Sequence, residues 1–88
     1  MGENLQHAFY AKRIARIYQD MDKPAKVEEY ALQSVYIDPY DLTAHELLAD
    51  AYEKTNNTAG LEREKRVMKE LQDWAAKRKA EGEAPSTR

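Results

Sequence analysis

The apolar residues of this chain recur at spacings of three and four, which is the period of a helix that buries one face. No stretch alternates apolar and polar side chains over the length of a strand. The pattern therefore predicts an all-α chain, with a first helix from Asn4 or Leu5 to about Met21. The apolar positions that define this helix are Ala8, Ala11, Ile14, Ala15, Tyr18 and Met21.

Aspartate and proline residues mark the bounds of a second helix. Asp22 is expected to cap it, and Pro24 lies in its first turn, where the missing N–H costs nothing because no carbonyl lies behind it. Asp38 and Pro39 follow Ile37. The second helix is expected to end at Ile37, because the residue before a proline is pushed out of the helical region.

Two further helices follow the same logic. Asp41 is expected to cap a third helix that continues to about Lys54, and Thr58 is expected to cap a fourth. No residue between Leu61 and Glu81 resembles a helix breaker, so the fourth helix is expected to be a single one of about 20 to 24 residues. Trp74 is expected to cover the open edge between the third and fourth helices, and the tail from Gly82 onward to be disordered.

A second regularity is a repeat with a period of 34 residues. A duplicated pair of helices at this period is typical of an interaction scaffold rather than of a catalyst. Asp73 stands where the second copy would have the equivalent of Pro39. The matching positions are Ile14 with Leu48, Ala15 with Ala49, Tyr18 with Tyr52, Ala25 with Ala59, Val27 with Leu61, and Glu28 with Glu62.

On these positions, and on the closing Asp38 and Pro39, residues 8–74 resemble two tetratricopeptide repeats. The resemblance implies a right-handed solenoid of two antiparallel helical hairpins with a long C-terminal helix. It also departs from the family at Ala11, His45, Lys65 and Asp73, where the pattern has aromatic, aromatic, apolar and proline residues. The implied division is a leader with the start of the first helix at 1–7, one repeat at 8–41, another at 42–75, a helix extension at 76–81 and a disordered tail at 82–88.

The resemblance also implies that the first helix of each hairpin forms a concave face that binds an extended peptide. Lys12 and Arg16 are expected to face Glu46 and Asp50 across this surface. The same arrangement fits a solvated structural face, because exposed ion pairs contribute only about 0 to 1 kcal/mol. Phe9 is the candidate apolar anchor. The candidate peptide-binding residues are Phe9, Lys12, Arg16, Gln19, Thr43, Glu46, Asp50 and Glu53.

A different surface of the first helix carries a second functional hypothesis. A stripe of large apolar side chains has no preceding helix in this sequence to cover it. It predicts a C-terminal structural or oligomerisation domain of a larger protein, for example an enzyme, which packs against upstream repeats or a second copy. The alternative is that Tyr10 and Met21 pack onto Tyr30 and Ile37 as ordinary core. The stripe consists of Tyr10, Ile14, Ile17 and Met21.

Composition argues against several other classes. The net charge of −2 gives no general attraction to nucleic acid, and no apolar run is long enough for a membrane span or a signal peptide. The chain has no cysteine, and His7 and His45 lie on different predicted helices, so we expect no metal site and no cofactor. With no nucleophile beside a base, we expect a non-enzymatic protein, and a cytoplasmic one if this is the whole chain.

Overall fold

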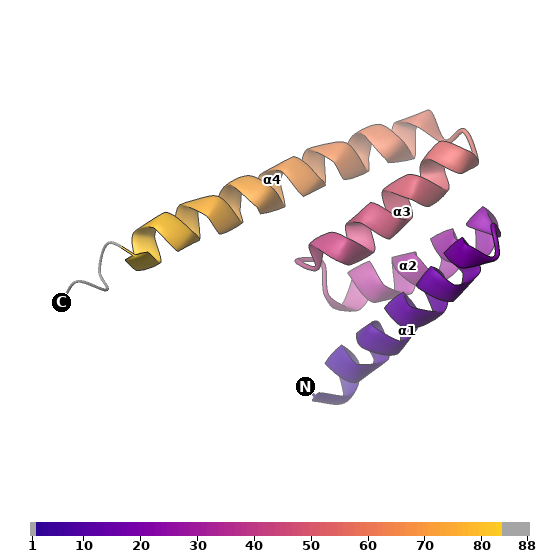
Figure 1. The fold of residues 1–88 in the computed structure, drawn as a ribbon, viewed down its shortest axis with the longest axis horizontal. Helices are drawn as coiled ribbons and strands as arrows, with labels where there is room; N and C mark the ends of the chain where they lie inside the picture. The colour runs from indigo at the N-terminus through magenta and orange to yellow at the C-terminus, as the bar shows by residue number, and fades with distance from the viewer. Residues whose placement is uncertain (1, 84–88) are drawn as a thin grey trace.

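The computed structural model describes residues 2–83, with side chains from 5 to 78, and consists of four helices (Figure 1). Residues 2–83 contain no strand, so the all-α prediction is confirmed. The helices are α1 (Gly2–Asp20), α2 (Pro24–Ile37), α3 (Leu42–Lys54) and α4 (Thr58–Glu83).

The helices contact one another in chain order. α1 packs on α2, α2 on α3 and α3 on α4, and α1 also touches α3. In Figure 1, α1 and α3 run in the same direction, while α2 and α4 return in the opposite one. The connections at 21–23, 38–41 and 55–57 are short, which favours antiparallel neighbours.

Small side chains let these helices approach closely. Ala15 on α1, Ala31 on α2 and Ala51 on α3 are completely buried, where a larger side chain would separate the helices. Tyr18 and Tyr30 stack at the edge of this core with ring centroids 5.7 Å apart. The buried cluster consists of Ala15, Val27, Ala31, Leu47, Leu48, Ala51 and Tyr52.

Three predicted helix boundaries are confirmed, and one of them is the end of α3 at Lys54. α2 ends at Ile37, directly before Asp38 and Pro39. Asp41 precedes α3, and its carboxylate Oδ1 accepts a hydrogen bond from the backbone N–H of Thr43 at 3.1 Å. This is the geometry of a side-chain N-cap.

The other two predicted caps are wrong. Asp22 adopts a left-handed conformation with φ 59° and closes the turn after α1, and the residue preceding α2 is Lys23, whose side chain makes no capping bond. Thr58 lies inside α4, and the cap is Asn57, whose Oδ1 accepts from the N–H of Gly60 at 3.0 Å. In each of these connections one residue turns in the left-handed conformation, Asp22 with φ 59° and Asn56 with φ 63°.

α4 is longer than the sequence predicts. It has 26 residues and includes Gly82 and Glu83, which were expected in the disordered tail; residues 84–88 lie outside the described part. Because α3 has only 13 residues, α4 runs past it and projects from the other helices (Figure 1). The projecting part has no neighbouring helix among residues 2–83.

Candidate peptide-binding groove

A small hollow lies between α1 and α3, the two helices predicted to form the concave face. Its volume is about 160 Å³. α1 contributes Arg16 and Gln19, and α3 contributes Thr43, Glu46 and Leu47. The structure therefore brings together four of the eight predicted peptide-binding residues and adds Leu47, which the sequence analysis did not select.

The charged pairs across this groove differ from those expected. Lys12 Nζ contacts Asp41 Oδ2 at 2.7 Å, and Gln19 Nε2 donates to Asp50 Oδ2 at 3.1 Å. The expected pairing of Lys12 and Arg16 with Glu46 and Asp50 is therefore wrong.

The physical reason is the direction of side chains on a helix. The observed pairs are separated by 29 and 31 residues rather than by the 34 of the repeat. Side chains lean toward the N-terminus of their helix, and the long Lys12 and Gln19 side chains lean farther than the short aspartates they meet. Each partner on α3 thus lies nearer the start of that helix than the repeat spacing suggests.

Arg16 and Glu46 are left free by this arrangement. Both are exposed, and neither forms an ion pair with any side chain in the described range 5–78. Asp50 is occupied, since it accepts from Gln19 and lies 3.5 Å from Lys54 Nζ. Polar contacts between α1 and α3 therefore border the groove, and two charges of opposite sign within it are unpaired.

The remaining predicted residues lie at the margins of the groove. Phe9 is half-exposed on α1, and the Arg13 guanidinium lies 6.0 Å from its ring centroid, within cation–π range. Glu53 lines a different hollow, together with Asn56 and other residues at the α3–α4 turn. Phe9 remains available as an apolar contact, whereas Glu53 does not line the hollow that holds Arg16 and Glu46.

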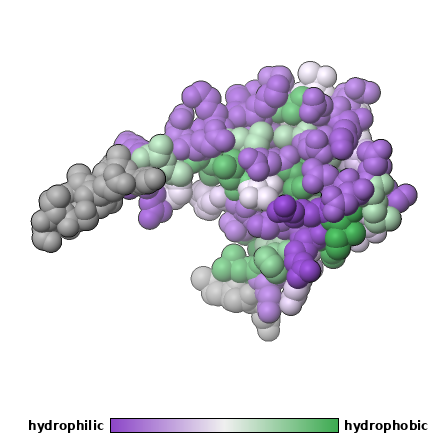
Figure 2. Space-filling model, viewed as in Figure 1, coloured by the Kyte–Doolittle hydropathy of each residue, from purple (hydrophilic) through white to green (hydrophobic). Residues whose placement is uncertain are grey.

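The apolar stripe of α1 is uncovered. The exposed fractions of Tyr10, Ile14, Ile17 and Met21 are 52%, 36%, 55% and 54%. The alternative that Tyr10 and Met21 pack onto other side chains as core is therefore wrong, and Tyr30 stacks on Tyr18 instead. In Figure 2 the visible face is mostly hydrophilic, with a hydrophobic area at the lower right where Figure 1 places α1.

A buried polar contact joins α3 to α4. His45 Nδ1 lies 2.6 Å from Glu64 Oε1, and His45 Nε2 lies 2.8 Å from the carbonyl oxygen of Pro39. Both His45 and Glu64 are buried. Since both ring nitrogens face oxygen atoms, the contact needs a proton on each side of the ring or a proton held by Glu64. It ties α4 and the α2–α3 connection to α3.

The hydroxyl of Tyr52 is a second buried polar group at this junction. Burial, together with the negative charge of Glu28, raises the pKa of Tyr52 above its ordinary value of 10.0. Arg63 opposes this effect, because its guanidinium donates to the Tyr52 hydroxyl at 3.4 Å. The net effect is a raised pKa, which favours the neutral phenol of Tyr52 in the folded chain.

Trp74 does not cover an edge as predicted. Its side chain is half-exposed, stacks on Tyr40 with centroids 6.0 Å apart and carries the Arg78 guanidinium 4.8 Å from its ring centroid. Trp74 lies beyond the start of α3, so only the α2–α3 connection reaches it. A hollow of about 410 Å³ beside it is lined by Pro39, Tyr40, Val67, Glu70, Leu71 and Trp74.

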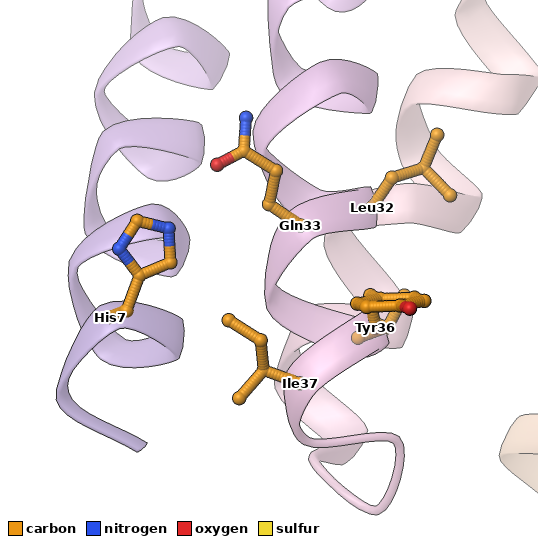
Figure 3. A pocket seen from close by; sticks show the side chains of 6 residues that line it. His7, Leu32, Gln33, Tyr36 and Ile37 are labelled. Atoms are coloured by element: carbon orange, nitrogen blue, oxygen red, sulfur yellow. The ribbon is translucent and has the colours of Figure 1, made fainter. Parts of the chain in front are cut away.

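Another hollow wraps around the C-terminal part of α2 and has a volume of about 510 Å³ (Figure 3). In Figure 3, His7 of α1 lies on the same side of α2 as Gln33 and Ile37, while Leu32 and Tyr36 lie on the opposite side. The lining is mainly apolar, and its polar groups do not converge on one point. The shape is that of an open surface depression.

Within the described residues, no three His, Asp or Glu side chains come together as ligands for a metal ion. None of the described helices has an apolar stretch long enough to cross a membrane. Comparison with known proteins yields no match to a family model, to a curated protein or to a solved structure.

Proposed function

We propose that this chain is a non-catalytic protein interaction module that resembles two tetratricopeptide repeats and binds an extended peptide in the groove between α1 and α3. The 34-residue repeat and the packing of the helices in chain order support this proposal. α1 and α3 run in the same direction, so they offer a peptide two helical walls with the same polarity.

The observation that carries the proposal is the unpaired state of Arg16 and Glu46. Other charges in the groove are used within the fold, as in the contact of Lys12 with Asp41. Arg16 and Glu46 line the same hollow from opposite helices and have no ion-pair partner among side chains 5–78. A peptide with an acidic side chain near Arg16 and a basic one near Glu46 would complement them.

Phe9 supplies the apolar part of the proposed interface. Exposed charges contribute about 0 to 1 kcal/mol each, so a charged groove alone binds weakly. Aromatic side chains are frequent anchors in protein interfaces because they bury a large apolar area. We therefore propose a ligand with an apolar residue at Phe9 and mixed charges farther along α1.

The experiment is a selection from a displayed library of random linear peptides, followed by affinity measurements by fluorescence polarisation. Replacement of Arg16 and Glu46 together by alanine is expected to weaken binding of the selected peptides at least about tenfold, which corresponds to 1.4 kcal/mol. Phe9→Ala is expected to weaken binding as well. The melting temperature of these variants should change little, because all three side chains are exposed.

A matched control removes an opposite-charge pair elsewhere. Lys69 and Asp73 form an exposed ion pair of 3.2 Å on α4, away from the groove. Replacing both by alanine keeps the net charge, as the groove variant does, and should leave peptide affinity unchanged. A library with no enriched peptides, or equal losses in the groove and control variants, would refute the proposal.

A further inference from the structure

The residue spacing of the uncovered stripe on α1 is the same in both directions along the helix. Its four residues, Tyr10, Ile14, Ile17 and Met21, are separated by four, three and four positions. An antiparallel copy of the same helix can therefore match each position with another of the same stripe. Each of the four side chains is between a third and just over a half exposed, so apolar area remains to be buried.

We propose that a second copy of this chain covers the stripe, with the two α1 helices antiparallel about a two-fold axis between residues 15 and 16. In this register Tyr10 meets Met21 of the second copy, and Ile14 meets Ile17 of the second copy. Every contact occurs twice, as an isologous interface requires.

Charges beside the stripe fit the same register. Arg13 and Asp20 lie seven residues apart, so they share one edge of α1, and neither has an ion-pair partner among side chains 5–78. In an antiparallel pair, the same edges of the two helices face each other. Arg13 then lies near Asp20 of the second copy, and Asp20 near Arg13 of the second copy. This reciprocal charge complementarity favours a second copy over an unrelated apolar partner.

The proposed interface leaves the α1–α3 groove open. On a helix with 3.6 residues per turn, Arg16 projects about a third of a turn away from the centre of the stripe. Arg13 lies against the Phe9 ring, so the two proposed surfaces meet there. They are separated at Arg16 and Glu46, which lie outside the stripe, and either proposal can fail alone. Four partly exposed side chains offer a few hundred Å², less than the roughly 800 Å² per partner of a standard interface. The dimer is consequently expected to be weak and to dissociate on dilution.

Sedimentation equilibrium over a range of concentrations tests the dimer. The wild type is expected to shift from dimer to monomer on dilution, and Ile17→Glu to weaken self-association at least about tenfold by placing a charge in the interface. Leu32→Glu is the matched control, since Leu32 is an exposed apolar residue on α2. A wild type that stays monomeric at every concentration would overturn the proposal, and so would equal effects of Ile17→Glu and Leu32→Glu. Either result would indicate that a different protein chain covers the stripe.

Charge reversal tests the register. Arg13→Glu and Asp20→Arg should each weaken self-association, while the variant with both changes should recover it because the pairs are re-formed with exchanged signs. The two single variants mixed together should form a mixed dimer in preference to either self-dimer. Circular dichroism checks that each variant keeps its helices. If the double variant associates no better than the single ones, the antiparallel register is refuted.

Cysteine cross-linking tests the direction, because the chain has no cysteine of its own. With a rise of 1.5 Å per residue, position 17 is offset from its own copy by about 4.5 Å along the helix, and position 10 by about 16 Å. Ile17→Cys should therefore form a disulfide-linked dimer on oxidation, and Tyr10→Cys should not. Equal cross-linking at both positions would indicate parallel helices and would overturn the antiparallel arrangement.

Discussion

His45 and Glu64 are the two polar side chains whose burial most affects the second hairpin. The side chain of His45 links Glu64 on α4 to the carbonyl of Pro39 before α3. Removing one partner of a buried pair leaves the other without compensation for its lost hydration. A single side chain thus connects three segments of the fold.

Glu64→Ala is expected to lower the free energy of unfolding by about 3 kcal/mol, because His45 keeps its burial and loses its carboxylate partner. Glu64→Gln should lower it by about 1 kcal/mol, because an amide retains a hydrogen bond to the ring. Urea unfolding followed by circular dichroism measures both. Equal stability of wild type and Glu64→Ala would show that the contact contributes nothing to folding.

Tyr52 makes the stability of the fold depend on alkaline pH. Burial raises the pKa of Tyr52 above 10.0, so the folded chain prefers the neutral phenol more strongly than the unfolded chain does. The stability from this preference is complete below the ordinary pKa of 10.0 and is lost as the pH rises through the higher value of the folded state.

We expect the wild type to lose stability more steeply above pH 10 than Tyr52→Phe, with a constant difference between them at neutral pH. Urea unfolding at a series of pH values measures this difference and cancels the effects of other titrating groups. Curves that remain parallel through the alkaline range would contradict the expected role of Tyr52.

At the residue scale, the sequence predicts which side chains are buried better than it predicts which side chains they contact. His45 is buried at a position where the tetratricopeptide pattern has an aromatic residue, yet nothing in the spacing identified Glu64 as its partner. That choice depends on how far α4 is rotated about its own axis, which packing against α3 decides. The same holds for Lys12, whose contact with Asp41 reflects the lean of a long side chain rather than the period of the repeat.

Among the helices, α4 packs closely on α3 at Gly60. An added Cβ would lie 2.9 Å from Nδ2 of Asn57 and 2.9 Å from ring atoms of Tyr52. The Tyr52 ring belongs to the buried core, where its packed neighbours limit its movement. Gly60 is therefore required by packing even though glycine weakens a helix.

Gly60→Ala tests this competition between helix propensity and packing. Alanine gains about 1 kcal/mol in a helix interior, whereas overpacking costs about 1 to 3 kcal/mol, so the variant should be less stable than the wild type. Ala59→Gly, at the exposed neighbouring position, measures the propensity effect alone in the same turn. A Gly60→Ala protein more stable than the wild type in thermal unfolding would show that the α3–α4 contact can relax.

At the element scale, most of the architecture follows from local chemistry. Pro39 ends α2 and Asp41 starts α3 for reasons contained in a few neighbouring residues. The observed caps, Lys23 before α2 and Asn57 before α4, each lie one residue from the predicted position. The geometry of a turn between two helices depends on how the helices pack, which the local sequence does not contain. The projecting end of α4, which leaves Trp74 half-exposed, could not be predicted from a pattern that continues without a breaker.

For the whole molecule, α1 is the helix on which both proposals depend. One of its faces borders α3 and presents Arg16, and another presents Ile17 to solvent. Because these faces point in different directions, the proposed peptide groove and the proposed self-association surface can be varied separately. Ile17→Glu should leave peptide affinity unchanged, and Arg16→Ala should leave self-association unchanged.

The most direct test of the proposed groove is a nuclear magnetic resonance titration of the ¹⁵N-labelled chain with a peptide selected as above. We predict that chemical-shift changes concentrate at Arg16, Gln19, Thr43 and Glu46, extend to Phe9, and are absent along the exposed face of α4. Changes centred on the hollow beside Trp74 or on the outer face of α2, with the groove unaffected, would contradict the proposal.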